Sequence, residues 1–226
     1  VEDADDRLIA ATPSFVKGHS QGEYVFDHSW AEAYMRAGGR YYPKIQVAAP
    51  FTPATGPRLL VANGPHANEA REALIAGLDA LREQVRGSSI HVTFAQEPDM
   101  AALLDAGYLE RHDIQFHWRN EGFGSYDEFL ATLASRKRKA LKRERREALS
   151  AGIEIAVLSG ADLTESVWDD FHAFYEDTGS RKWGRPYLNR RFFSEIGQRM
   201  GERVVLVLAR RAGRNIAGAI NFRGGN

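Results

Sequence analysis

Apolar residues recur along the chain with two different periods, which indicates alternating helices and strands. Over residues 68–86 they recur every three or four positions, and Gly87 follows, so this segment is predicted to be an amphipathic helix. Shorter apolar runs bounded by glycine, proline or polar residues predict strands. The strands are expected within 8–26 and over 45–49, 90–95, 114–118 and 153–158.

Polar residues mark where other helices begin. Ser29-Trp-Ala-Glu32 and Ser125-Tyr-Asp-Glu128 have the form of a capping box, in which serine and glutamate satisfy free amides of the first helical turn. The first predicts a short helix ending at 38–39, and the second predicts a long helix running to about Ser150. Further helices are expected over 99–105, 164–178 and 189–200, followed by a β-hairpin of 203–210 and 215–223. The expected fold class is therefore mixed α/β, with helices flanking a mixed central sheet.

The composition narrows the class of protein. Hydrophobic residues make up 43% and charged residues 27%, as in a globular protein, and the sequence contains no cysteine. A disulfide, a thiolate nucleophile and a cysteine-based zinc site are thereby excluded. No apolar run approaches the roughly 20 residues that span a bilayer, and the first residues are acidic, unlike those of a signal peptide. We expect a cytoplasmic protein with no membrane span.

Charge is divided unevenly between the two halves of the chain. Residues 1–117 carry 10 Lys and Arg against 16 Asp and Glu, whereas residues 118–226 carry 20 against 14. This split suggests two modules, although an unevenly distributed polar surface explains it equally well. Residues 119–124 are the expected boundary. Because the chain starts without methionine and stops just after a predicted strand, we expect it to be a fragment of a longer protein.

The most distinctive element is a basic helix between Arg136 and Arg146, in which eight of eleven residues are Lys or Arg. At 100° per residue, Arg136, Lys139, Arg143 and Arg146 form a stripe along one flank, and Lys137 projects toward the apolar face. A solvated helix face is the simpler interpretation. Repulsion between like charges three and four positions apart instead favours an anionic partner, such as a polyphosphate, an RNA backbone or an acidic lipid.

Motifs for nucleophilic or metal chemistry are weak. Gly18-His-Ser-Gln-Gly22 matches the G-x-S-x-G nucleophile elbow of α/β-hydrolases, with Ser20 as the nucleophile. That motif needs a helix directly after the serine, and residues 23–26 have a strand-like pattern instead. The seven histidines show no metal-ligand spacing, so no metal site is expected, and His91 and His117 are interpreted as structural.

Two loops supply candidate ligand-binding side chains. Residues 50–58 lie between a strand and a helix, where phosphates often bind, but Pro53 and Pro57 lack the amides that would bind a phosphate, and Arg58 is the only charged residue. Aromatic residues outside the predicted helices, Tyr24, Trp183 and Tyr187, are candidate pocket walls. Packing in the core explains them equally well.

Six stretches distributed along the chain together suggest a family. They are His19-Ser-Gln-Gly-Glu-Tyr-Val-Phe-Asp27, Tyr41-Tyr-Pro-Lys44, Pro50-Phe-Thr-Pro-Ala-Thr-Gly-Pro-Arg-Leu-Leu60, Phe116-His-Trp-Arg-Asn120, Ser135-Arg-Lys-Arg-Lys139 with Arg143-Glu-Arg145, and Trp183-Gly-Arg-Pro-Tyr-Leu188. At these residues the chain resembles the FemAB-like family of N-acyltransferases, which are related to the GNAT fold and associated with peptidoglycan biosynthesis or recognition.

The resemblance implies two GNAT-like modules in tandem. Residues 1–118 would be the later part of the first module, and residues 119–226 the opening part of the second, with the basic helix. Related Fem ligases take the acyl group from an aminoacyl-tRNA, and GNAT enzymes take it from an acyl-CoA. Either is therefore an expected co-substrate, with no permanently bound cofactor. The expected acceptor is an amine, for example on a cell-wall precursor.

This resemblance predicts a GNAT-type N-acyltransferase and gives the candidate residues roles. Donor phosphates would contact Arg136, Lys137, Lys139 and Arg143. The candidate proton acceptors are Glu23, Asp27 and His19, and the candidate substrate-binding residues are Tyr24, Arg58, Trp183 and Tyr187. Two alternatives stay open: a non-catalytic module that binds RNA or a polyanionic cell-wall precursor, and, less favoured, a serine hydrolase using Ser20.

Overall fold

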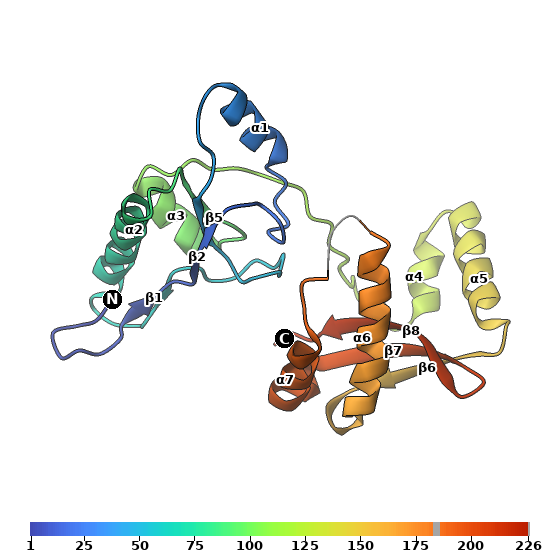
Figure 1. Ribbon diagram of the computed structural model, residues 1–226. Helices are drawn as coiled ribbons and strands as arrows, with labels where there is room; N and C mark the ends of the chain where they lie inside the picture. The colour runs from blue at the N-terminus through green and yellow to red at the C-terminus, as the bar shows by residue number, and fades with distance from the viewer. Residues whose placement is uncertain (183–185, 226) are drawn as a thin grey trace. The chain divides into compact units, whose positions relative to one another are not determined.

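A computed structural model describes residues 1–182 and 186–225. The chain divides into two compact units, Val1–Phe116 and His117–Asn226, each with its own hydrophobic core (Figure 1). The division falls within two residues of the boundary expected between the modules. Both units combine helices with small sheets, so the predicted mixed α/β class is confirmed. The assignment of the units to GNAT-like modules stays a prediction.

A three-stranded sheet forms the centre of the first unit. Its strand β3 (Lys44–Val47) pairs antiparallel with β2 (Ser14–Lys17) and parallel with β5 (Ile90–Val92). A second pair joins β1 (Ala10–Ala11) to β4 (Leu60–Val61). The expected mixed arrangement therefore occurs here, but in small separate sheets rather than in one central sheet.

The two faces of β3 are chemically different because successive side chains of a strand point to opposite faces. Ile45 and Val47 are fully buried in the core with residues of helix α2 (Ala67–Gln84), the amphipathic helix expected from the sequence. Lys44 and Gln46 lie on the opposite, polar face, and they too are buried. The loop of residues 18–27, between β2 and α1, contacts Lys44 on this polar face, which places the candidate site there.

Two expectations for the first unit are wrong. Helix α1 (His28–Arg36) begins one residue before Ser29, with Asp27 at the cap position and no side-chain capping bond, so the capping box predicted at Ser29 does not form. Residues 114–118 are not a strand, although their alternating pattern suggested one, because no neighbouring strand pairs with them. Helix α3 (Glu97–Asp105) is present as expected.

In the second unit, an antiparallel sheet contains β6 (Ile153–Leu158), β7 (Val204–Arg211) and β8 (Arg214–Phe222). The predicted hairpin is therefore confirmed. Helices α6 (Glu165–Ser180) and α7 (Arg190–Met200) pack on one face of the sheet (Figure 1). Short 3₁₀ helices lie at Gly160–Asp162 and Gly201–Arg203. The core of this unit is formed by Leu163, Trp168, Phe171, Phe193, Ile196, Val204, Leu206 and Leu208.

The long helix expected over 125–150 is two helices, α4 (Tyr126–Thr132) and α5 (Ser135–Leu149). The chain between them is extended, with ψ of 150° at Leu133 and 141° at Ala134. The cap at Ser125 is confirmed, since its hydroxyl accepts from the amide of Glu128 at 3.2 Å. The Glu128 carboxylate accepts from the amide of Gly124 rather than from that of Ser125. Within the described residues no helix is long and apolar enough to cross a membrane.

Candidate functional site

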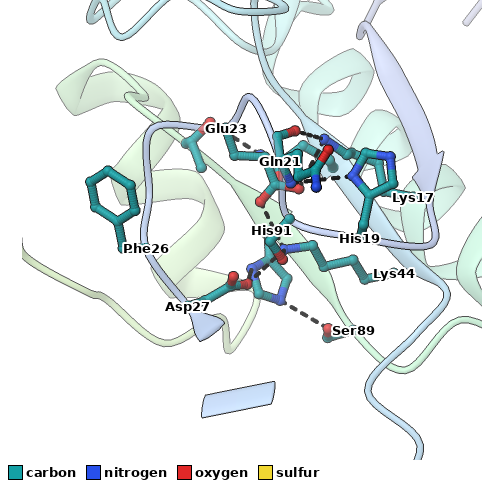
Figure 2. A network of polar contacts seen from close by, with 12 residues as sticks. Lys17, His19, Gln21, Glu23, Phe26, Asp27, Lys44, Ser89 and His91 are labelled. Atoms are coloured by element: carbon teal, nitrogen blue, oxygen red, sulfur yellow. Dashed lines mark hydrogen bonds and ion pairs between the residues drawn. The ribbon is translucent and has the colours of Figure 1, made fainter. Parts of the chain in front are cut away.

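Lys44, at the start of β3, is the centre of a buried polar network in the first unit. Its side chain is fully buried, and its ammonium donates to Ser20 Oγ at 2.8 Å, Glu23 Oε2 at 2.7 Å and Asp27 Oδ2 at 2.6 Å (Figure 2). An ammonium has three hydrogens to donate, so these three bonds use its full capacity. Lys44 therefore holds the loop of residues 18–27 against the polar face of the sheet.

Backbone geometry lets that loop turn sharply enough to reach Lys44. Gly22 has φ of +77°, and a Cβ at this position would lie 2.4 Å from the ring of Phe51. Tyr24 also has positive φ, at 55°. Glycine is needed at position 22 both for the left-handed conformation and for the close approach of the aromatic ring. Three of the stretches that resemble the family, 19–27, 41–44 and 50–60, thus meet at one place.

Asp27 is ionised and fixed within this network. Burial raises its pKa, but hydrogen bonds from Lys44, Ser20 and Tyr41, with the charge of Lys44, outweigh burial and lower the pKa to about 2. The hydroxyl of Tyr41 donates to Asp27 Oδ2 at 2.8 Å, and burial and this bond raise the pKa of Tyr41. A carboxylate with such a low pKa is a weak proton acceptor near neutral pH. Asp27 is thus better suited to orienting a cation than to the role of base.

Glu23 lies between two lysines. Its Oε2 accepts from Lys44, and its Oε1 lies 3.2 Å from Lys17 Nζ. Lys17 also donates to the carbonyl of Gln21 at 2.6 Å. Two buried carboxylates therefore face two ammonium groups, so the formal charges of these four side chains cancel.

Two histidines have different positions relative to this network. His19 is exposed, and its Nδ1 accepts from the amide of Gln21 at 3.2 Å within its own loop (Figure 2). His91, on β5, is half-buried beside the network: its Nδ1 lies 3.9 Å from Asp27 Oδ2, and its Nε2 lies 2.9 Å from Ser89 Oγ. Burial first, and then the charge of Lys44, lower the pKa of His91 below its ordinary value.

The sequence analysis named Glu23 and Asp27 as candidates, but it interpreted His91 as structural and assigned no role to Lys44 or Tyr41. A signal for Lys44 and Tyr41 was available, because both lie in the Tyr41-Tyr-Pro-Lys44 stretch. A lysine that opens an apolar strand is also unusual, since buried lysines need a partner. His91 had no such signal, because its position depends on the pairing of β3 with β5.

The other predicted substrate-binding residues are separate from the network or support it indirectly. Arg58 is buried, and its guanidinium donates to the carbonyls of Thr93, Ala54 and Pro57, so it braces the 50–58 loop. The side chains of Tyr24 and Tyr187 are exposed in the first and second units, respectively. Trp183 lies outside the described residues.

The basic helix α5 has two distinct sides in the second unit. On the side toward α4, Lys142 Nζ lies 2.8 Å from Asp127 Oδ1, the Arg145 guanidinium lies 4.9 Å from the centre of the Tyr126 ring, and Arg138 donates to the carbonyl of Ala131. By helical spacing Arg136, Lys139 and Arg143 lie on the flank away from these contacts, and Lys137 lies between the two sides; all four are exposed.

This exposed group has few acidic neighbours. Across the described residues, no carboxylate lies within ion-pair distance of Arg136, Lys137 or Lys139, and Arg143 lies 3.6 Å from Glu147. The expectation that Lys137 leans toward the core is wrong. The break at 133–134 separates Lys137 from Leu133, and α5 itself contributes no buried residue. We call Arg136, Lys137, Lys139 and Arg143 the basic flank.

The described part of the chain contains no group of three or more His, Cys, Asp or Glu side chains that could hold a metal ion. Comparison with family models gives a match over residues 1–226 to the FemAB-like model, which is described as peptidoglycan biosynthesis/recognition. The chain belongs to the FemAB-like family. No curated protein sequence matches the chain. The family resemblance found at the six stretches is thus confirmed for this FemAB-like protein.

Proposed function

We propose that this FemAB-like protein transfers an acyl or aminoacyl group from a phosphate-bearing donor to an amine, and that the amine belongs to a cell-wall precursor. The observation that carries the proposal is the basic flank of α5, where four cations are exposed and three of them lack an acidic partner among the described residues. Membership of a family concerned with peptidoglycan supports the choice of acceptor.

The basic flank has the properties of a phosphate-binding surface. Its residues span positions 136–143, which corresponds to about 10 Å along a helix. Like charges three and four positions apart repel by a few tenths of a kcal/mol per pair, and an anion would relieve that repulsion. Phosphate oxygens accept strong charge-assisted hydrogen bonds from Lys and Arg. An acyl-CoA and an aminoacyl-tRNA both carry such phosphates, so both remain proposed donors.

The network around Lys44 supplies groups for the amine acceptor. An amine reaches the protein mainly as an ammonium, and it must lose a proton to attack an ester or thioester carbonyl. Asp27 is buried and paired with Lys44, so Glu23 and His19 remain the proposed proton acceptors for the amine. Holding the amine and carbonyl in reacting geometry would supply much of the rate enhancement.

A matched pair of variants on one helix tests the donor site. Lys139→Gln removes a charge from the basic flank, and Lys142→Gln removes a charge that is already paired with Asp127. Binding of fluorescently labelled tRNA is measured by anisotropy over a salt series, with unlabelled CoA as competitor. We expect Lys139→Gln to weaken binding and to reduce the salt slope by about one. We expect Lys142→Gln to have a much smaller effect.

Equal effects of the two variants would contradict the proposed donor site. The basic flank also suits the second candidate function, a non-catalytic module that binds RNA or a polyanionic precursor. That function predicts the same difference in binding between the variants, but no transfer of an acyl group to any amine. Competition by CoA would favour acyl-CoA as the donor, and binding of tRNA without competition by CoA would favour aminoacyl-tRNA.

A further inference from the structure

Ser89 directly precedes β5 and His91 is the second residue of this strand, so the two lie two positions apart in extended chain and their side chains share one face of the sheet. The parallel pairing of β5 with β3 places Ile90 opposite Ile45, so this is the polar face that also carries Lys44. Figure 2 shows His91 between Asp27 and Ser89. Residues from the 18–27 loop and from β5 thus meet beside the Lys44 network.

The three side chains follow the order hydroxyl, imidazole, carboxylate. His91 Nε2 lies 2.9 Å from Ser89 Oγ, within the range expected between a nucleophile and its base. His91 Nδ1 lies 3.9 Å from Asp27 Oδ2, which is too long for a hydrogen bond but within the distance at which the carboxylate pairs with a protonated imidazole. In such an order the imidazole takes the hydroxyl proton, and the carboxylate stabilises the imidazolium that forms. Asp27 has a second oxygen, Oδ1, that is buried and has no hydrogen-bond partner.

The surroundings of His91 favour the neutral imidazole that a base requires. Asp27 and Glu23 face it from the 18–27 loop, Lys44 faces it from β3, and Arg111 lies further along the chain. The ring of Tyr41 packs edge-on with a centroid separation of 6.0 Å. Burial, Lys44 and Arg111 lower the pKa of His91, and the two carboxylates oppose them. The imidazole is thus uncharged near neutral pH, and its side chain is still 23% exposed.

Ser20, the serine of the G-x-S-x-G motif, has a different environment. It is 6% exposed, and its Oγ accepts from the Lys44 ammonium and bonds to the Tyr42 hydroxyl. An ammonium that already donates to two carboxylates cannot accept a proton from the serine. Residues 21–25 form a turn and bends, and no helix begins before His28, which also departs from the nucleophile elbow. Ser89 is half-buried and has an imidazole as its neighbour.

We propose that Ser89 is an acyl-accepting nucleophile, that His91 is its base, and that Asp27 is a positioning residue for the imidazole. Ser89 Oγ would attack the carbonyl carbon of an activated ester or thioester while its proton moves to His91 Nε2. The bond from the carbonyl carbon to the leaving oxygen or sulfur then breaks, and His91 returns the proton to that leaving group. An amine or water releases the acyl group from Ser89 Oγ, which regains a proton. This chemistry goes beyond the proposed function and does not depend on it.

Labelling of the whole chain with a fluorophosphonate probe tests this proposal without a known substrate. The serine oxygen displaces fluoride from the probe, and the labelled peptide is located by trypsin digestion and mass spectrometry. Ser89 lies in the tryptic peptide 87–111 and Ser20 in the peptide 18–36, so the two are distinguished by mass, and fragmentation separates Ser89 from Ser88. Matched variants are Ser89→Ala, His91→Gln and, as a control on exposed helix α1, Ser29→Ala.

We expect the label on Ser89 in the unmodified chain, its loss in Ser89→Ala, and labelling at least about 100-fold slower in His91→Gln. Ser29→Ala should be labelled at the normal rate. Thermal unfolding of each variant checks that it is folded. Absence of label from a folded unmodified chain, label on the 18–36 peptide, or an unchanged rate in His91→Gln would overturn the proposal.

Discussion

Replacing Lys44 by methionine should destabilise the first unit strongly. The substitution keeps an unbranched side chain one atom shorter than lysine but removes three hydrogen bonds of 2.6–2.8 Å. In this variant Glu23 would still pair with Lys17, 3.2 Å away, whereas Asp27 would still accept a hydrogen bond from the Tyr41 hydroxyl but would have no ammonium beside it. Removing one partner of a buried ion pair costs about 3–5 kcal/mol, because a charge is left buried without compensation. We expect Lys44→Met to cost about this much at neutral pH.

Native-state hydrogen exchange measures this cost where it arises. The amide of Ile45 donates to the carbonyl of Ser89 across β3 and β5, so its protection reports the opening of the sheet. Lys142→Met is the matched control, because Lys142 forms an ion pair with Asp127 in which both side chains are exposed. Lys142→Met should change the free energy of unfolding by no more than about 0.5 kcal/mol.

The double variant Lys44→Met/Asp27→Asn identifies the cause of the loss. It removes the charge that Lys44→Met leaves unpaired, so it should be more stable than the sum of the two single variants predicts, by about 1–3 kcal/mol. A loss below about 1 kcal/mol in Lys44→Met, or simple additivity in the double variant, would refute the reasoning. Either result would mean that water, rather than Lys44, compensates the two carboxylates.

Three further predictions concern individual residues. Gly22→Ala should lower the free energy of unfolding in urea by about 2 kcal/mol, because position 22 has positive φ and a Cβ there would meet the ring of Phe51. Gly18→Ala should lower it little, because the space at that Cβ position is open. Equal losses in the two variants would contradict this geometry. The pKa of Asp27 in the folded state, about 2, lies below the ordinary value of 3.8. Ionised Asp27 should therefore add about 2 kcal/mol to the free energy of unfolding above about pH 4, and this contribution should be lost as the pH falls from about 4 to 2. A urea midpoint with the same acid dependence in Asp27→Asn would exclude this contribution. Ser125→Ala should lower the stability of α4 by about 1 kcal/mol, measured as reduced amide protection at the start of that helix; unchanged protection would exclude the cap.

The elements that the sequence predicted well depend on local patterns. Helix α2 has an uninterrupted apolar period, and the β7–β8 hairpin is closed at Ala212 and Gly213, where φ is positive. The break between α4 and α5 was not predictable in this way. Leu133 and Ala134 are neither glycine nor proline, so no residue at this point signals the end of a helix.

The candidate site was predictable only in part, for a related reason. The stretch from 19 to 27 identified Glu23 and Asp27, because both lie in one segment of the chain. Their common partner Lys44 is 17 residues from Asp27 in sequence, and His91 lies on a strand that pairs with β3 through a crossover. Contacts of this kind depend on strand order and register, which apolar periodicity does not determine.

The most direct test of the proposed function is transfer of a radiolabelled acyl group by the whole chain. The donors are acetyl-CoA and an aminoacyl-tRNA in separate reactions, and the acceptor is a soluble peptidoglycan peptide with a free primary amine. The account predicts label in the peptide from one of the donors, and a raised KM for that donor in Lys139→Gln but not in Lys142→Gln. Absence of transfer from both donors by the folded protein, or an equal change of KM in the two variants, would contradict it.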